Sequence, residues 1–276
     1  MPILNKDMSV CISLAGRPSN LGTRFHNFLY DELGLNFIYK AFTTDDLEGA
    51  VRGIRALGIR GCSVSMPFKE AVIPLVDEVE PSAAAIDSVN TIVNEGGRLI
   101  ASNTDYEAIA MLIAEHGLDP ASRVLVRGSG GMAKAVVAAF RGAGFSDVTV
   151  VARNEAAGAA LAAKYGYEWV PTVLTGSGPA PTFDVIVNVT PLGMHGPDAA
   201  ALAFAPAFIE RASTVIDVVA FPAETPLILA GRAAGKRVIS GAEVIALQAA
   251  RQFERYTGVA LTRDQVERAS AFSRAE

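Results

Sequence analysis

A short glycine-rich segment near the middle of the chain has the residue types and spacing of a dinucleotide-binding turn. It fits the pattern GxGxxG/A and reads Gly128-Ser129-Gly130-Gly131-Met132-Ala133. The first glycine of this pattern allows a tight turn, the second lets a pyrophosphate approach the backbone, and free N–H groups of the following helix bind the phosphates. An ordinary glycine-rich loop is the alternative. Because the segment lies between an apolar strand and an Ala-rich helix, we predict a nicotinamide-dependent oxidoreductase.

The residues after the next strand bear on the choice between the two nicotinamide cofactors. An NAD site places Asp or Glu there to accept a hydrogen bond from the ribose 2′-hydroxyl. This chain has Arg153 followed by Asn154. A guanidinium forms forked, charge-assisted hydrogen bonds with a phosphate and stacks on adenine, so we expect NADP in preference to NAD. A solvated surface arginine is the alternative interpretation.

Oxidation of an alcohol by such a cofactor also needs a group that takes the hydroxyl proton. Lys69 follows an apolar strand and a proline turn, and partial burial would lower the pKa of a lysine toward neutrality. A lysine that extends into solvent is the alternative. Asp105, in the triplet Asn103-Thr104-Asp105, is by pattern alone equally a helix cap or first-turn acid, and Asn90 with Thr91 is equally a simple turn.

Composition excludes several other classes of function. The net charge of −5 and the isoelectric point near 5.4 argue against nucleic-acid binding, and three histidines and two cysteines at no useful spacing argue against a metal site. No apolar run is long enough to span a bilayer, and the first ten residues lack the order of a secretory signal. We therefore expect a cytoplasmic protein, a monomer or homodimer without nucleic-acid or membrane partners, that acts on a small molecule.

The elements that must position these residues alternate between strands and helices. In the first third we predict strands and helices at Ser9–Leu14, Thr23–Leu33, Asn36–Phe42, Asp45–Leu57 and Gly61–Ser65, a rhythm that implies parallel pairing. A second series is predicted at Tyr106–His116, Arg123–Arg127, Met132–Gly142, Val148–Ala152, Glu155–Tyr165, Asp184–Val189 and Val215–Val219, with a Gly/Pro-rich loop at Thr175–Pro181. Two helices, Ala242–Thr257 and Arg263–Ser273, end the chain. Runs of Val and Ile suit parallel strands covered on both faces.

Segments spread in order over essentially the whole chain resemble the shikimate/quinate dehydrogenase family. Val64–Lys69 is similar to its VTxPxK segment, Val89–Thr91 to VNT and Asn103–Asp105 to NTD. Further matches are Gly128–Met132 to GxGGA, Ala152–Asn154 to NRT, Asn188–Met194 to NxTxxGM, Glu224–Leu227 to TPL and Gly241–Gln248 to the segment that ends in a substrate-binding Gln. Each match is weak alone, and their order makes the set specific.

The resemblance implies an α/β fold of two domains with the active site in the cleft between them. Residues 1–103 with C-terminal helices in 239–276 would bind substrate, and 104–238 would form a Rossmann-type, doubly wound parallel-sheet domain for NADP. The implied reaction interconverts a cyclic polyhydroxy acid and its 3-keto form, as in aromatic amino acid biosynthesis. Lys69 would exchange the proton and Asp105 would orient it. Asn90 and Gln248 would bind hydroxyls, Ser65 would replace the family's threonine, and the residues beside the nicotinamide would be Thr190, Val218 and Gly241.

Two departures from the family pattern fall on substrate binding. The segment Gly16–Asn27 is two residues shorter than the family's carboxylate-binding motif, so Ser19, Asn20 and Thr23 are candidate donors and Arg17 or Arg24 a candidate charge. Ser19 and Thr23 as mere turn or helix caps are the alternative. Ala220 stands where the family usually has Tyr. We therefore expect the shikimate dehydrogenase-like branch, with weaker activity on shikimate than the pathway enzyme.

Two other functions stay open from the sequence. A non-catalytic sensor that binds cofactor or polyol is consistent with the altered substrate segment. A protein like methylenetetrahydrofolate dehydrogenase would share the two-domain layout, but it does not account for the ordered NTD and VNT segments.

Overall fold

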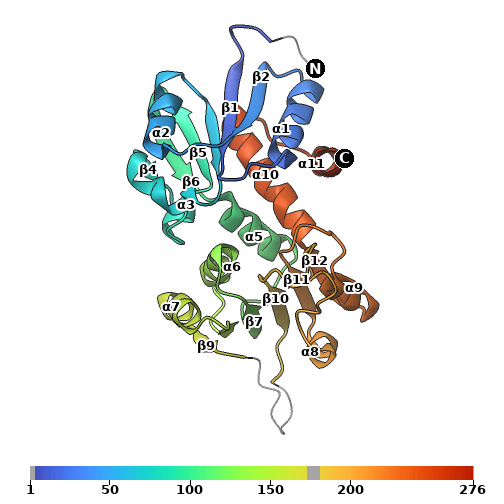
Figure 1. The fold of residues 1–276 in the computed structure, drawn as a ribbon. Coiled ribbons are helices and arrows are strands. Elements are labelled where there is room, and N and C mark those ends of the chain that lie inside the picture. Colours follow the sequence, from blue (N-terminus) through green and yellow to red (C-terminus); the bar gives the residue numbers. More distant parts are fainter. Residues whose placement is uncertain (1–3, 173–180, 276) are drawn as a thin grey trace. The chain divides into compact units, whose positions relative to one another are not determined.

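The computed structural model describes residues 4–172 and 181–275 and divides the chain into two compact units (Figure 1). The first unit comprises Met1–Glu107 and Ala246–Glu276, and the second comprises Ala108–Ile245. Each contains a six-stranded sheet with helices packed on it. In the sequence, the divisions fall within two helices, α5 (Thr104–Glu115) and α10 (Gly241–Thr257). The predicted two-domain α/β fold class is confirmed.

The sheet of the first unit mixes parallel and antiparallel pairs. Its order is β2-β1-β3-β5-β6-β4, and its strands are β1 (Ser9–Leu14), β2 (Phe37–Phe42), β3 (Gly61–Val64), β4 (Glu78–Val79), β5 (Thr91–Glu95) and β6 (Arg98–Ser102). β1 pairs in parallel with β2 and β3, as the alternating pattern predicts. β5 is antiparallel to both β3 and β6. The turn between β5 and β6 is Gly96-Gly97, with φ of 62° and 95°, a hairpin signal that our reading of the sequence missed.

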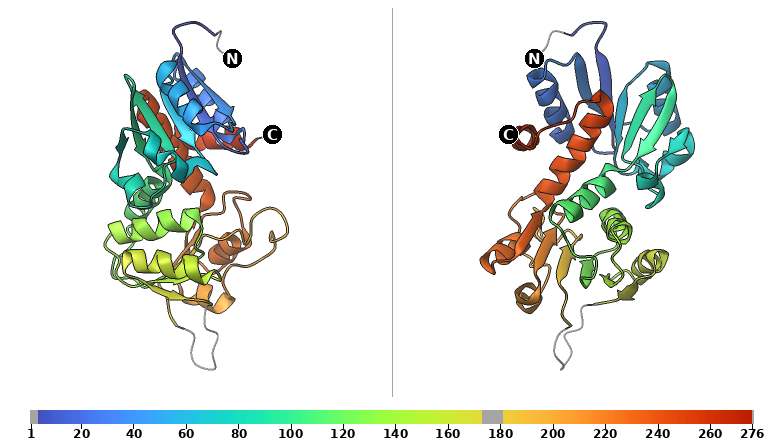
Figure 2. Two further views of the ribbon diagram at one scale, coloured as in Figure 1. Left: turned by 60° about the vertical axis from the view of Figure 1, so that its left-hand side comes forward. Right: turned by 180° about the vertical axis from the view of Figure 1, so that it is seen from behind.

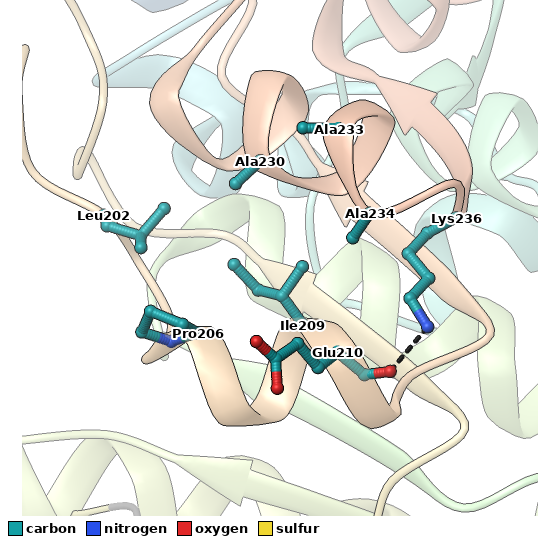
Figure 3. A pocket seen from close by; sticks show the side chains of 8 residues that line it. All are labelled: Leu202, Pro206, Ile209, Glu210, Ala230, Ala233, Ala234 and Lys236. Atoms are coloured by element: carbon teal, nitrogen blue, oxygen red, sulfur yellow. Dashed lines mark hydrogen bonds between the residues drawn. The ribbon is translucent and has the colours of Figure 1, made fainter.

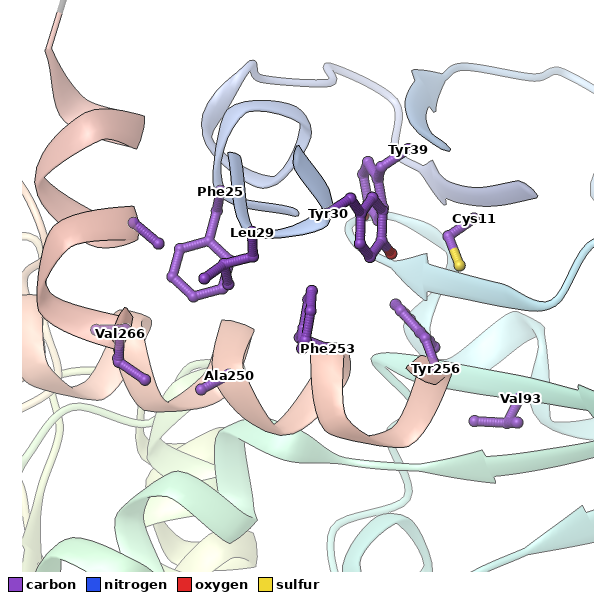
Figure 4. Packing of buried hydrophobic residues seen from close by; sticks show 12 residues of the cluster. Cys11, Phe25, Leu29, Tyr30, Tyr39, Val93, Ala250, Phe253, Tyr256 and Val266 are labelled. Atoms are coloured by element: carbon purple, nitrogen blue, oxygen red, sulfur yellow. The ribbon is translucent and has the colours of Figure 1, made fainter. Parts of the chain in front are cut away.

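Helices and aromatic rings cover one face of this first sheet. The helices are α1 (Leu21–Glu32), α10 and α11 (Arg263–Arg274). Figure 4 shows their buried side chains packed beside Cys11, Tyr39 and Val93 of the sheet. Tyr30, Phe253 and Tyr256 are each 1% exposed or less, and burial of one such ring contributes roughly 2–3 kcal/mol. The other face carries α2 (Leu47–Ala56) and the short elements α3 (Phe68–Ala71), Ile73–Leu75 and α4 (Pro81–Ala84). This packing holds α10 against the strands from which the candidate site is built.

The second sheet is parallel throughout. Its order is β12-β11-β10-β7-β8-β9, and its strands are β7 (Val124–Arg127), β8 (Val148–Val151), β9 (Glu168–Val170), β10 (Val185–Asn188), β11 (Thr214–Asp217) and β12 (Arg237–Ser240). The chain starts at β7, runs outward to β9, and then returns to β10 on the other side of β7. This reversal is the switch point at which open parallel sheets bind ligands beyond the carboxyl ends of their strands. The predicted doubly wound arrangement is confirmed.

Helices pack on this second sheet at positions close to those predicted. They are α6 (Gly131–Gly142), α7 (Glu155–Tyr165), α8 (Pro206–Arg211) and α9 (Pro226–Ala233). Figures 1 and 2 show α6 and α7 side by side, while side chains of α8 and α9 share a core cluster with Leu125 and Ile186 of the sheet. The predicted loop Thr175–Pro181 lies outside the described residues except for Pro181. No helix in the described part of the chain combines the length and apolarity needed to cross a membrane.

Candidate active site

An ion pair in the first unit joins the two residues expected to handle the proton. Lys69 Nζ lies 2.7 Å from Asp105 Oδ2, although 36 positions separate the residues in the sequence. The side chains are 28% and 14% exposed. Lys69 lies in the short helix α3 rather than in the strand-end turn that the sequence suggested, and Asp105 lies in the first turn of α5. A carboxylate at a helix N-terminus is favoured by the helix dipole, so Asp105 is well placed to hold an ammonium.

A buried polar network adjoins this ion pair. Asn90 is 2% exposed, and its Oδ1 accepts hydrogen bonds from the backbone N of Thr104 at 2.8 Å and from the hydroxyl of Thr91 at 2.8 Å. Gln248 Nε2 donates to Thr104 Oγ1 at 3.2 Å. Thr104 therefore links Asn90 to Gln248 and immediately precedes Asp105. The structure brings together four residues that the sequence predicted separately.

The amide nitrogen of Asn90 is an unsatisfied donor within this network. Its Nδ2 is buried and has no hydrogen-bond partner among the described residues. A buried donor without an acceptor costs about 1–3 kcal/mol. A substrate hydroxyl or carbonyl oxygen placed against Asn90 would offset this cost, which makes the position suitable for recognition of an oxygen atom.

Two further residues of the network were missed from the sequence. Thr104 connects its two halves, and Gln252 donates from Nε2 to the backbone O of Asn90 at 3.2 Å and to Thr91 Oγ1 at 3.0 Å. Gln252 is 4% exposed and follows Gln248 by one helical turn. The spacing of four between two glutamines on one helix was the available signal, because such residues lie on the same face.

The glycine turn of the second unit leaves open backbone at the start of a helix. Gly128 has φ of +126°, and a Cβ there would lie 2.8 Å from Val189 Cγ2 and 3.1 Å from the Val189 carbonyl oxygen. A Cβ on Gly130 or Gly131 would meet nothing within 4 Å, and the N-cap Gly130 provides no side chain to cap α6. Ser129 belongs to the turn and Met132 to the first turn of α6. Free N–H groups beside unobstructed backbone fit a pyrophosphate.

Arg153 and Asn154, the two candidate residues after β8, differ in how far their side chains are free to bind a ligand. Arg153 is exposed. Asn154 is the N-cap of α7, and its Oδ1 accepts from the backbone N of Ala157 at 3.0 Å. The side-chain oxygen of Asn154 is therefore used by the helix, which leaves only its amide nitrogen for a ligand.

Thr190 and Val218, two of the three residues expected beside the nicotinamide, are held by hydrogen bonds at the carboxyl ends of β10 and β11. Asn188 accepts from the backbone N of Thr190 at 3.0 Å and from its hydroxyl at 2.6 Å, and Asn188 Nδ2 donates to Asp217 Oδ1 at 3.0 Å. The backbone N of Val218 donates to the Asn188 carbonyl at 3.0 Å. A Cβ on Gly241 would lie 2.2 Å from the carbonyl oxygen of Val219, so only glycine permits this approach.

Asp217 organises this network from inside the second unit. It is fully buried, and burial raises the pKa of its carboxyl group, against the opposing effect of hydrogen bonds from Thr225, Val219 and Asn188. Thr225 Oγ1 donates to it at 2.6 Å. Neither Asn188 nor Asp217 was predicted as a site residue, although each is a polar residue that ends a run of buried Val and Ile, which was a usable signal.

Known proteins match this chain over most of its length, and a family model matches part of it. A family model described as the shikimate dehydrogenase substrate binding domain matches residues 19–92. The shikimate dehydrogenase-like protein of Haemophilus influenzae is 55% identical over 273 residues, with 99% of each chain covered. The NADP(+) shikimate dehydrogenase of Chlorobaculum tepidum is 37% identical over 257 residues, with 87% of each chain covered.

This chain belongs to the shikimate dehydrogenase family.

Solved structures agree with this membership in the shikimate dehydrogenase family of oxidoreductases. A shikimate 5-dehydrogenase-like protein matches with a TM-score of 0.95 and 55% identity, with 99% of this chain and 100% of that chain covered. The Thermus thermophilus shikimate 5-dehydrogenase in complex with NADP(H) and shikimate matches with a TM-score of 0.84 and 29% identity, with 96% and 100% covered. The predicted family is confirmed, and so is the likeness to its shikimate dehydrogenase-like members.

The segment that departs from the family pattern lies at the start of α1. The backbone N of Gly16 donates to the Met66 carbonyl at 2.9 Å, which ties this segment to the turn that carries Ser65. Ser65 and Ser19 are exposed. Thr23 Oγ1 is buried and has no hydrogen-bond partner among the described residues, so a capping bond from Thr23 is not observed. Arg24 donates to the Phe272 carbonyl at 3.0 and 3.2 Å, which directs its charge toward α11.

The second unit also has a surface hollow of about 520 Å³ beside α8 and α9 (Figure 3). Its lining is mostly apolar, with one ionic side chain of each sign, and consists of Leu202, Pro206, Ile209, Glu210, Ala230, Ala233, Ala234 and Lys236. None of the predicted site residues lines it. Within the described ranges, no group of three or more His, Cys, Asp or Glu side chains is arranged to hold a metal ion.

Proposed function

We propose that the protein is an NADP-dependent alcohol dehydrogenase that interconverts a cyclic polyhydroxy acid, shikimate or a related compound, and its 3-keto form. The observation that carries this proposal is the 2.7 Å pair of Lys69 and Asp105 beside the buried network of Asn90 and Gln248. Similarity to the NADP(+) shikimate dehydrogenase of Chlorobaculum tepidum and to the Thermus thermophilus enzyme in complex with NADP(H) and shikimate supports the choice of reaction and cofactor.

Lys69 and Asp105 would divide the proton chemistry between them. In the direction of oxidation, Lys69 Nζ takes the proton of the substrate hydroxyl as the O–H bond breaks. In the reverse direction, the Lys69 ammonium returns that proton to the carbonyl oxygen. Asp105 stabilises the ammonium and orients Nζ, and its second oxygen can accept from a neighbouring ring hydroxyl. NADP, when bound, exchanges the hydride with the carbinol carbon.

Recognition of the substrate would rest on buried amides and on the altered loop. Asn90 Nδ2 and Gln248 hydrogen-bond ring hydroxyls, and a site built this way rejects molecules without those hydroxyls because its polar groups would be left unpaired. Ser65, Ser19 and Thr23 supply hydroxyls for the carboxylate end. Because Arg24 is engaged elsewhere and Ala220 replaces a tyrosine, we propose weaker binding of shikimate than in the pathway enzyme.

The residues of the second unit fit NADP. Gly128, Ser129, Gly130, Gly131 and Met132 would present backbone to the pyrophosphate, since the space above Gly130 and Gly131 is open. Arg153 would pair with the 2′-phosphate, and the amide nitrogen of Asn154 lies beside it in sequence. Thr190, Val218 and Gly241 would line the nicotinamide. A quinate dehydrogenase of Corynebacterium glutamicum is known in complex with NAD, at 26% identity, so both cofactors belong in the test.

The test is an assay of absorbance in the NADPH band with shikimate, quinate and related hydroxy acids, each with NADP and NAD. We expect turnover with NADP, and we expect turnover of shikimate to require more than micromolar concentrations of it. Lys69→Met should lower kcat by two orders of magnitude or more while the affinity for NADPH stays unchanged. Lys40→Met, which removes an exposed lysine of the same unit, is the control. Saturable binding of NADPH without turnover of any acid would instead favour a sensor, and retained activity of Lys69→Met would refute the assigned proton transfer.

A further inference from the structure

We propose that Arg127 is a second phosphate-contacting residue, which together with Arg153 forms a two-arginine site for the 2′-phosphate and sets the preference for NADP over NAD. This inference rests on the proposed function, because it concerns the same cofactor site. Arg127 lies just before the glycine turn and outside the segments that resemble the family's motifs.

The two arginines lie at the carboxyl ends of neighbouring parallel strands. Arg127 is the last residue of β7 and pairs in register with Val151, the last residue of β8, and Arg153 follows Val151 by two positions. The backbone N of Gly128 donates to the Val151 carbonyl at 2.8 Å, which keeps the two strand ends together. In parallel-sheet dinucleotide sites, the residue after the second strand meets the ribose 2′ substituent. Arg127 therefore lies at the end of the strand beside the one that leads to the ribose 2′ position.

The charges at this edge lack a counter-ion. The Arg127 side chain is half-buried, and its pKa is lowered first by burial and then by the positive charge of Arg153. In the part of the chain that the structure describes, no carboxylate forms an ion pair with either arginine, whereas Arg123, the residue before β7, pairs with Asp147 at 3.1 Å. Two cations near one another are unfavourable unless an anion lies between them. A phosphate monoester with nearly two negative charges meets that need, and a ribose hydroxyl does not.

A purely structural role is the competing explanation. Arg127 Nη1 donates to the carbonyl of Ala203, in the segment before α8, and could serve only to hold that segment. Holding one neutral carbonyl requires a single N–H donor and no charge. The two explanations therefore predict different results for a substitution that keeps an amide donor and removes the charge.

The experiment uses the chain of residues 1–276 and Arg127→Gln, with Arg153→Gln for comparison and Arg123→Gln, just before the same strand, as the matched control. Affinity for NADPH and NADH is measured by calorimetric titration, and thermal unfolding is recorded without cofactor. We expect Arg127→Gln to bind NADPH roughly tenfold more weakly and NADH within twofold of wild type, with a Tm equal to or above that of wild type. Adenosine 2′,5′-bisphosphate should lose affinity in parallel with NADPH, and Arg123→Gln should change neither cofactor.

The outcomes separate the inference from the proposed function. Equal losses for NADPH and NADH with a lowered Tm would show that Arg127 is structural, and unchanged affinity for NADPH would likewise overturn the inference alone. A wild-type chain that binds neither cofactor would overturn the proposed function, and the inference with it.

Discussion

His26, in the core of the first unit, offers a prediction about pH that can be worked out from its surroundings. It is fully buried, its ring stacks on that of Tyr39 with centroids 4.5 Å apart, and neither ring nitrogen has a hydrogen-bond partner among the described residues. Burial lowers the pKa of His26 from 6.5 to about 3, with a smaller opposing effect from Gln252. His26 is therefore a neutral core residue at physiological pH.

The sign and size of the effect follow from linkage. Below pH 6.5 the unfolded chain takes up a proton on His26 and the folded chain does not, so stability falls as the pH drops from 6.5 toward 3. Between pH 7.5 and 5 this one group should reduce the free energy of unfolding by about 2 kcal/mol. Above pH 7.5 it should have no effect. The neighbouring Tyr39 and Tyr256 stay uncharged over this range because burial raises the pKa of each.

The assay combines titration with unfolding. In a spectrum of the three histidines, the His26 signal is assigned by its absence from His26→Phe, and it should not shift between pH 8 and 5. Urea unfolding at pH 7.5 and 5 should show that wild type loses about 2 kcal/mol more than His26→Phe over this interval. A His26 signal that titrates near 6.5 in the folded protein, or equal pH dependence of both proteins, would refute the reasoning.

Two further predictions concern the candidate site. Asp105→Asn keeps the shape of the side chain but removes the charge that holds Lys69, so kcat should fall by about 100-fold or more while the affinity for NADPH stays unchanged. The control, Asp45→Asn at an exposed position, should leave kcat unchanged. Wild-type turnover of Asp105→Asn would contradict the role of that carboxylate. Gly241→Ala places a Cβ against backbone, so it should lower the free energy of unfolding in urea by roughly 1–3 kcal/mol and weaken NADPH binding. The control, Gly53→Ala in α2, has open space for its Cβ and should not destabilise the protein. Equal stability of the two variants would show that the backbone near Gly241 moves to accept the Cβ.

Much of the fold was predictable because it depends on local pattern. Runs of buried Val and Ile indicated the parallel strands β7, β10 and β11, and the glycine spacing indicated the turn that follows β7. These signals depend on residues close in sequence, so they can be recognised without knowledge of the rest of the chain. The β5–β6 hairpin was not predicted, although Gly96-Gly97 is a two-residue turn signal.

The site itself was predictable only in part. By residue type alone, a lysine such as Lys69 is more often solvated and Asp105 could be only a helix cap; the resemblance across many segments was what assigned both to one site. The connecting role of Thr104, the exposed state of Ser19 and the engagement of Arg24 with α11 have no local signature, whereas Gln252 had one in its spacing from Gln248.

The sequence by itself determined the fold class, the family and the location of the glycine turn, because hydrophobic period, turn chemistry and motif spacing are properties of neighbouring residues. Only the tertiary structure decided that Lys69 lies 2.7 Å from Asp105, that the amide nitrogen of Asn90 is buried without a partner, and that His26 is a core residue. Hydrogen bonds and burial depend on distances between atoms from distant parts of the chain. Those distances exist only after helices and strands have packed.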